Sequence, residues 1–129
     1  MTTNTSMTIY NKYTNPNTKE VIYKRHLIDN VFWDDSLNVN LNQGYENADK
    51  VRVFVPKNKN DISKYIEQKQ YNGDGWTFQN GDFIIKGNCI VTNATGVKDL
   101  SDYNVFRITT FDDKDFGSAN MQHFEIRGN

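Results

Sequence analysis

Residues 76–87 constrain the fold of this chain more than any other segment. The aromatic run Trp-Thr-Phe at 76–78 is followed by Asn-Gly-Asp at 80–82 and by the apolar run Phe-Ile-Ile at 83–85. Two such runs separated by an Asn-Gly turn are typical of a β-hairpin. No side chain in the segment is placed for catalysis, so it predicts β structure and no particular chemistry.

Short β-type runs recur along the rest of the chain, separated by turn signals. Asn15-Pro16-Asn17-Thr18 is one such turn, because proline presets φ and asparagine tolerates unusual turn geometry. Further strands are predicted at 7–13, 20–25, 27–33, 37–42, 50–55, 89–92, 105–111 and 121–127. Many short strands of this kind predict a mainly β fold, either a small antiparallel β-barrel or a sandwich.

Residues 57–75 interrupt this β pattern just after Pro56, which cannot donate a ladder hydrogen bond. Ile62, Tyr65 and Ile66 lie at helical spacing, and Asp61 is a suitable N-cap. The segment is therefore predicted to be one long excursion loop that bears a short helix.

The length of 129 residues suits one domain with a single core. We expect a flexible N-terminus at 1–6 and a single β-barrel-like domain at 7–129. A net charge of -1 argues against a general binder of nucleic acid or of anionic membranes. The polar start does not resemble a signal peptide and no apolar run would span a bilayer, so we expect synthesis in the cytoplasm and no membrane partner.

The residues that most often carry chemistry lack a convergent pattern. Cys89 is a single cysteine in an apolar run, so a buried thiol is expected. His26 and His123 lie within predicted strands, with no activating serine or cysteine context. The acidic loop at 112–118 lacks the remaining ligands of a calcium loop and is expected to be solvated. We therefore expect no catalytic, metal-binding or cofactor-binding residues, and no enzyme.

Several short motifs follow one another in a defined order. They are Thr8-Ile9-Tyr10-Asn11, the strand ending in Phe32-Trp33, Val51-Arg52-Val53-Phe54-Val55-Pro56, the Gly81-Asp82 hairpin, Asp115-Phe116-Gly117-Ser118 and Met121-Gln122-His123-Phe124-Glu125. In this order they resemble a family of small structural proteins of tailed bacteriophages. Those proteins are encoded among the head-to-tail connection genes of phages and prophages of Gram-positive bacteria.

The resemblance implies a structural virion protein of the neck, most specifically a head-closure (stopper, or head-tail connector) subunit. Such a protein is a compact β-barrel with one long excursion loop. It assembles in the host cytoplasm into a homo-oligomeric ring, a hexamer or dodecamer. The ring joins the portal-adaptor complex to the tail terminator or tail tube and retains packaged DNA, with which its contact is non-specific. No catalytic residues or cofactors carry over.

Within this expectation, the excursion at 57–75 is the candidate inter-subunit or lumen-facing element. Its candidate residues are Lys57, Lys59, Lys64, Tyr65 and Lys69. A solvated lysine-bearing face is the alternative explanation for the same residues. At the level of the whole protein, one alternative is a tail terminator or another neck or tail protein. An alternative from a different class is a carbohydrate-binding module that uses Trp33 or Trp76.

Overall fold

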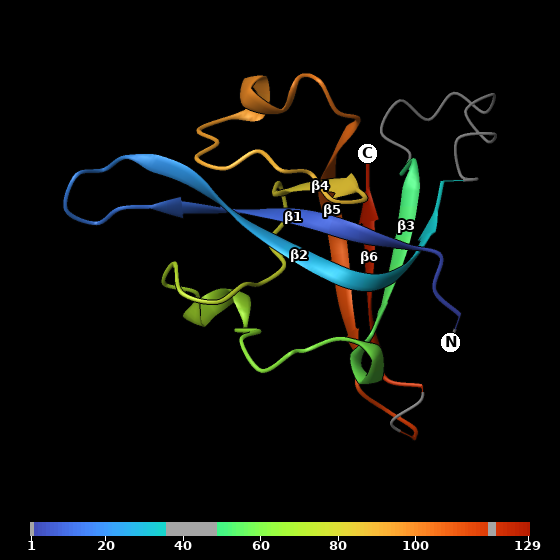
Figure 1. Ribbon diagram of the computed structural model, residues 1–129. Coiled ribbons are helices and arrows are strands. Elements are labelled where there is room, and N and C mark those ends of the chain that lie inside the picture. Colours follow the sequence, from blue (N-terminus) through green and yellow to red (C-terminus); the bar gives the residue numbers. More distant parts are fainter. Residues whose placement is uncertain (1, 36–48, 119–120) are drawn as a thin grey trace.

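The computed structural model describes residues 2–35, 49–118 and 121–129. In this part of the chain, antiparallel strands close into a barrel in the order β1-β2-β3-β6-β5-β4 (Figure 1). The strands are β1 (Thr5–Thr14), β2 (Val21–Asp34), β3 (Val51–Pro56), β4 (Phe83–Lys86), β5 (Val105–Lys114) and β6 (His123–Gly128). Three short 3-10 helices lie between them: η2 (Lys57–Lys59), η3 (Gln68–Gln70) and η4 (Val97–Leu100). The predicted mainly β fold is confirmed.

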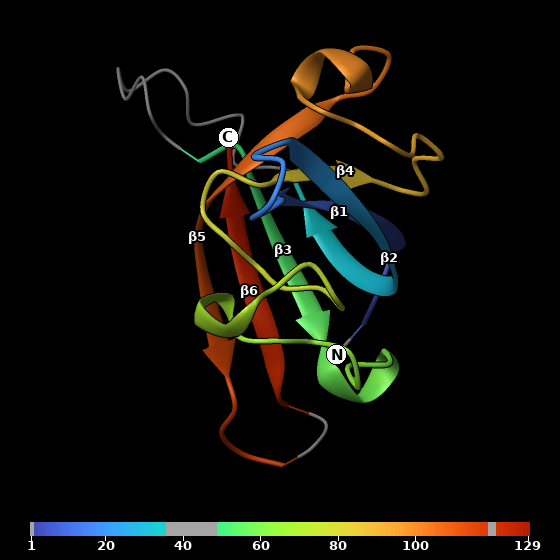
Figure 2. The same ribbon diagram turned by 90° about the vertical axis from the view of Figure 1, so that its left-hand side faces the viewer.

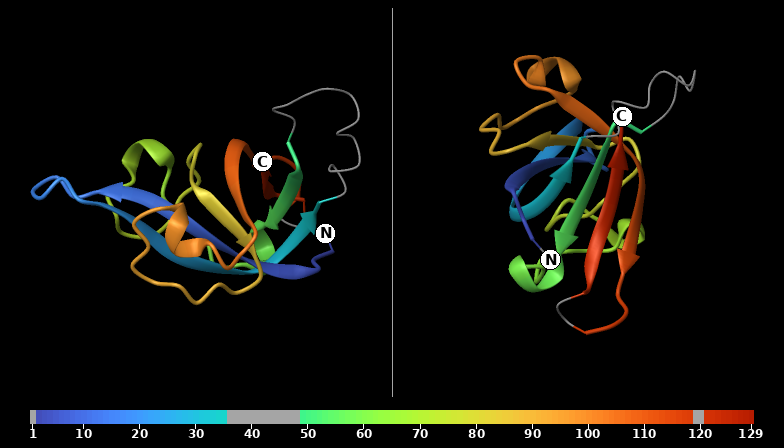
Figure 3. Two further views of the ribbon diagram at one scale, coloured as in Figure 1. Left: turned by 90° about the horizontal axis from the view of Figure 1, so that it is seen from above. Right: turned by 90° about the vertical axis from the view of Figure 1, so that its right-hand side faces the viewer.

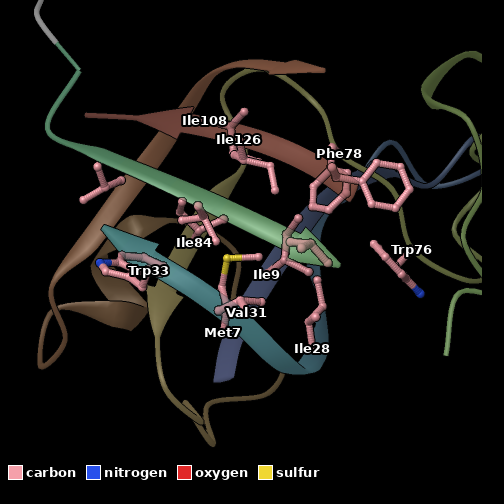
Figure 4. Packing of buried hydrophobic residues seen from close by; sticks show 14 residues of the cluster. Met7, Ile9, Ile28, Val31, Trp33, Trp76, Phe78, Ile84, Ile108 and Ile126 are labelled. Atoms are coloured by element: carbon pink, nitrogen blue, oxygen red, sulfur yellow. The ribbon is translucent and has the colours of Figure 1, made fainter. Parts of the chain in front are cut away.

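The barrel interior is filled by one face of each strand, because side chains alternate between the two faces of a sheet. Met7 and Ile9 of β1, for example, are buried in the same cluster as Ile84 of β4 (Figure 4). The other members of this interior cluster are Ile28, Val31, Trp33, Val51, Val53, Val55, Trp76, Phe78, Ile108, Phe124 and Ile126. Trp33 lies toward one end of the cluster, and Trp76 and Phe78 lie toward the other (Figure 4).

A second core lies outside the barrel wall. Tyr10 of β1 and Phe83 of β4 cluster with Cys89, Ala94 and Leu100 of the segment that connects β4 to β5. The Tyr10 hydroxyl lies 3.1 Å from Cys89 Sγ and donates a hydrogen bond to the Val91 carbonyl at 2.8 Å. The connecting segment therefore covers the outer face of β1 and β4, which explains why residues 7–11 are buried without alternation.

The first two strands form a long hairpin that extends beyond the barrel (Figures 1 and 3). The predicted turn is confirmed: Asn15 Oδ1 accepts a hydrogen bond from the Asn17 amide at 2.8 Å. The predicted strands at 20–25 and 27–33 are one continuous strand, β2. β1 also begins at Thr5, so the predicted flexible segment 1–6 is wrong at its C-terminal end. There Asn4 donates from Nδ2 to the Trp33 carbonyl at 3.0 Å.

The predicted hairpin at 76–87 is wrong in its first half. β4 pairs with β1 on one side and with β5 on the other, so neither edge of β4 is free for residues 76–78. Trp76 and Phe78 instead turn into the barrel interior, where they are buried. A strand can pair with only two neighbours. Both edges of β4 are occupied by β1 and β5, so residues 76–78 cannot pair with β4 as a local hairpin.

A buried polar clamp holds residues 76–78 across the end of the barrel. Asn11 points inward, and its side-chain amide donates to the Thr77 carbonyl at 2.7 Å and accepts from the Thr77 amide at 3.1 Å. Asn11 Nδ2 also donates to Asp82 Oδ2 at 3.0 Å, while Asp82 Oδ1 accepts from the Lys12 backbone amide at 3.1 Å. These contacts satisfy backbone groups that no neighbouring strand reaches.

The excursion at 57–75 bears two short 3-10 helices, η2 and η3, so the predicted loop with a short helix is confirmed, but no helix forms at 61–66 where the spacing placed it. Ile62 and Tyr65 lie between η2 and η3 and pack on the barrel core. Asp61 Oδ1 accepts a hydrogen bond from the Ser63 amide at 2.9 Å, which makes a local Asx turn and not a helix cap. Tertiary packing thus overrides a weak helical pattern.

The other predicted elements have mixed outcomes. The strands at 50–55, 105–111 and 121–127 correspond to β3, β5 and β6. The strand expected at 89–92 does not form. A register shift between Ile108 and Thr110 turns Phe111 toward the core in place of Thr110. The strand predicted at 37–42 lies outside the described residues.

The clamp generates a stability prediction. Asn11→Ala leaves the Thr77 amide and carbonyl without their partner in a buried site and removes one of the two hydrogen bonds to Asp82 Oδ2, so we expect the free energy of unfolding to fall by about 2–4 kcal/mol. Urea unfolding followed by tryptophan fluorescence measures the loss. Asn17→Ala, the same change in the exposed β1–β2 turn, is the control. Equal stability of the two variants would contradict the role assigned to Asn11.

Candidate functional site

Lys57 joins the start of the excursion to the β5–β6 hairpin. Its Nζ lies 2.5 Å from Asp113 Oδ1, 3.2 Å from Asp115 Oδ1 and 4.7 Å from the centre of the Phe124 ring. Its backbone amide donates to the Gln122 carbonyl at 3.0 Å. Burial alone would lower the pKa of Lys57, but hydrogen bonds to the two carboxylates raise it above its ordinary value. The ammonium group is therefore a fixed cation that braces the hairpin.

Beyond this brace, the tip of the β5–β6 hairpin exposes two large apolar side chains. Phe116 is 68% exposed and Met121 is 60% exposed. Gly117 takes φ 83°, which glycine adopts readily, and the Met121 amide bonds to the Ser118 carbonyl at 2.9 Å. Figure 2 shows this hairpin extending below the body of the barrel. Solvent-exposed apolar groups on a braced projection are characteristic of a docking surface.

The other candidate residues of the excursion divide into two groups. Tyr65 is half-buried and packs on Trp76, Phe78 and Phe124, with ring centres 5.1, 5.9 and 4.7 Å away. Lys59, Lys64 and Lys69 have exposed side chains. The structure therefore places Tyr65 and Lys57 in the attachment of the excursion to the barrel, and the remaining three lysines on its solvent side.

A close backbone contact fixes the far end of the excursion. The Trp76 amide donates to the Lys64 carbonyl at 3.1 Å, and the Ile66 amide donates to the Trp76 carbonyl at 2.8 Å. Gly75 takes φ 73°, and a Cβ atom there would lie 2.3 Å from the Lys64 carbonyl oxygen. Only glycine permits this approach, which ties the excursion to the segment that closes the barrel.

The closest arrangement to a reactive site is a pocket of about 230 Å³ beside β2. His26 stacks on Trp76 with ring centres 4.8 Å apart and planes inclined by 11°. Asp29, Asp61 and Lys64 also line the pocket. Burial lowers the pKa of His26, and the raising effect of the two carboxylates does not cancel it. No serine or cysteine lines the pocket among the described residues, so the histidine has no hydroxyl or thiol of these types to activate there.

Neither tryptophan offers the stacking platform that the carbohydrate-binding alternative needs. Trp33 is 4% exposed and Trp76 is 1% exposed, and both belong to the interior cluster. A sugar ring must reach an aromatic face from solvent, and these two faces are covered by protein.

The described part of the chain also meets neither the requirements of a metal site nor those of a reactive thiol. No group of three or more His, Cys, Asp or Glu side chains is arranged there to hold a metal ion. Asp113 and Asp115, the candidate calcium-loop residues, contact Lys57 instead. Cys89 is a buried free thiol, as predicted. No helix among the described residues is long and apolar enough to cross a membrane.

Sequence reasoning missed the hairpin tip as a candidate site. The available signal was the placement of Phe116 and Met121 around a glycine in an acidic, loop-forming segment, where core-filling residues are out of place. The interpretation of that segment as a solvated loop considered only its carboxylates.

The Lys57 brace predicts a stability difference between two lysines of one excursion. Lys57→Met keeps most of the aliphatic stem but removes the ion pairs and the cation–π contact, so we expect a loss of about 1 kcal/mol in the free energy of unfolding. Lys69→Met, on the exposed side, is expected to change it by less than about 0.5 kcal/mol. Urea titrations of both variants measure the difference. Equal free energies of unfolding for the two variants would show that the Lys57 contacts do not stabilise the protein.

The stacked histidine predicts a pH dependence of folding. The pKa of His26 is lower in the folded protein than its ordinary value of 6.5, so the unfolded chain takes up the proton first as the pH falls. The His26 contribution to stability is therefore full above that value and is lost as the pH drops through it. Arg25, Asp29 and Asp61 also act on the pKa of this histidine, Arg25 lowering it and the two carboxylates raising it.

We expect the free energy of unfolding of His26→Phe, which keeps an aromatic ring on Trp76, to fall less than that of the wild type between about pH 7.5 and pH 5.5. Urea unfolding at both pH values measures this, with His123→Phe as the control. If the two variants lost the same amount of stability, the pH dependence would arise elsewhere.

Comparison with known proteins places the chain in a family without assigning it a role. No curated protein and no solved structure matches it. The model of a family of unknown function, DUF6751, matches residues 1–129. That match covers the barrel, the excursion and the hairpin tip together, and the chain therefore belongs to the family DUF6751.

Proposed function

We propose that this protein is a structural, non-enzymatic subunit of the tailed-phage neck, most specifically a head-closure subunit. In that role it forms a ring between the portal-adaptor complex and the tail, and the ring retains packaged DNA. The ordered motifs support the proposal through their resemblance to neck proteins. The observation that carries it is the position of Phe116 and Met121. Both belong to those motifs, and both are presented to solvent on a projecting hairpin.

The architecture supports an assembly role on physical grounds. Each strand of the barrel has two strand neighbours, but β2 pairs with β3 only at Phe32–Asp34, so much of that edge of β2 has no strand beside it. The parts that project, which include the β1–β2 hairpin and the β5–β6 tip, offer further surface for contacts with other subunits (Figures 1 and 2). Identical subunits that contact one another head to tail form a closed ring when the rotation closes.

In this proposal the excursion is a fixed surface and does not act as a moving gate. Lys57 and Gly75 attach its two ends to the barrel, and Tyr65 attaches its middle. We assign to Lys59, Lys64 and Lys69 a fixed inter-ring or lumen-facing surface. Exposed ammonium groups on a fixed surface suit non-specific contact with phosphates or with an acidic neighbouring ring.

A tail terminator shares the same support, because it is also a ring-forming neck protein with projecting contacts. The carbohydrate-binding alternative is disfavoured by the burial of Trp33 and Trp76. An enzymatic role is disfavoured because no serine or cysteine lines the His26 pocket among the described residues.

The proposal predicts a specific assembly defect. In a phage or prophage that encodes this chain, Phe116→Ser together with Met121→Ser should yield filled heads that lose DNA or fail to join tails. The two side chains are solvent-exposed, so the variant should fold normally. Negative-stain microscopy of lysates counts joined particles, and Lys86→Ser, an exposed change on β4 outside the proposed contact surfaces, serves as the control.

Cryo-electron microscopy of intact particles tests where the protein resides. A ring of this chain between the portal-adaptor assembly and the tail is the expected result. A ring located at the tail tube would support the tail-terminator alternative. Particles that lack the chain altogether would overturn a virion role.

A further inference from the structure

The four large apolar side chains that stay exposed in the described part of the chain lie in two groups. Phe116 and Met121 are on the β5–β6 tip, while Ile90 (74% exposed) and Val97 (39% exposed) are on the segment between β4 and β5. Figures 1 and 2 both place the tip at the bottom of the molecule and that segment, coloured yellow to orange, in its upper part. One protein molecule cannot bring the two groups together.

A pocket of about 460 Å³ lies on the segment that carries the upper group. It forms where residues 92–95 cross the start of β2, a crossing held by the hydrogen bond from the Tyr23 amide to the Ala94 carbonyl at 2.8 Å. Ile90 lies two residues before the pocket-lining Thr92 in the chain, and Val97 lies two residues after the pocket-lining Thr95. The segment that lines this concave site is therefore bracketed in the sequence by two exposed apolar residues.

The charges of the tip and the pocket are complementary. Lys24 and Arg25 line the pocket, with no carboxylate among its described lining residues. Arg25 Nε donates to the Cys89 carbonyl at 2.5 Å, so its guanidinium is fixed at the pocket wall. The tip carries Asp112, Asp113 and Asp115 against Lys57 and Lys114, which leaves it net negative.

We infer that the β5–β6 tip of one subunit docks in the pocket at β2 and residues 92–95 of a second copy of this chain. Phe116 enters the pocket between Ile90 and Val97 of the neighbour, and the carboxylates of the tip face Lys24 and Arg25. The contact joins two different surfaces at opposite ends of the subunit, so it is heterologous, and repeating it builds a ring when the rotation closes. This inference deepens the proposed function, since a neck subunit needs such a contact with identical neighbours.

Cysteine cross-linking tests the contact directly. Phe116→Cys, carrying a tag that changes its mass, is mixed with Thr92→Cys and oxidised, and the products are separated on a non-reducing gel. We expect a mixed dimer as the main adduct. Lys86→Cys, at an exposed position on β4, replaces Thr92→Cys in the control mixture, and native Cys89, which is buried, stays in every variant. A mixed adduct no stronger than in the control, or a main adduct between two Phe116→Cys chains, would overturn the inference.

Sedimentation velocity over a range of concentrations supplies a second, independent readout. Phe116→Ser should raise the dissociation constant for self-association roughly tenfold or more, as loss of a buried aromatic contact requires, while the exposed change Lys86→Ser should leave it unchanged. An unchanged constant for Phe116→Ser would also overturn the inference.

The failure of this contact and the failure of the proposed function give different results. If particles contain a neck ring of this chain but no mixed adduct forms, the neck role is supported and this interface is rejected. If the mixed adduct forms but particles contain no copies of the chain, the head-to-tail contact is supported and the neck role is rejected.

Discussion

The hydrogen bonds between Asn11 and the backbone of Thr77 determine how this barrel is closed at one end. The side-chain amide takes the place of a neighbouring strand, because it offers Thr77 one donor and one acceptor at 2.7 and 3.1 Å. This pairing positions Trp76 and Phe78 inside the barrel, where Tyr65 of the excursion packs on both. The excursion, the barrel interior and the stack of His26 on Trp76 all depend on that placement.

Two long connections cover the barrel, and each is attached at several points. The excursion between β3 and β4 is attached by Lys57, by Tyr65 and by the close backbone approach at Gly75. The connection between β4 and β5 is attached by the Tyr10 hydroxyl and by the pairing of Tyr23 with Ala94. Both connections act as fixed walls. The exposed large apolar residues of the described chain lie on the β5–β6 hairpin and on the connection between β4 and β5, which are the surfaces that we propose for assembly.

How much was predictable differs from element to element. The β1–β2 turn and strand β3 were predicted well, because Asn15-Pro16-Asn17 and Pro56 act through local backbone geometry. The hairpin at 76–87 was predicted from equally strong local signals and is half wrong, because β1 and β5 occupy both edges of β4. The candidate lysines of the excursion differ in environment for the same reason: Lys57 meets Asp113 only through the pairing of β5 with β6. No local pattern distinguishes Lys57 from Lys69.

The sequence alone determined that this chain is a mainly β domain with a long excursion, a buried cysteine and a motif order that resembles phage neck proteins. Those properties follow from turn chemistry, strand alternation and composition, which act over a few residues. Only the tertiary structure decided that Trp76 and Phe78 fill the barrel, that Phe116 and Met121 face solvent, and that the tip and the basic pocket lie at opposite ends. These features depend on which strand edges pair across long stretches of chain, and the competition for those edges is a property of the whole fold.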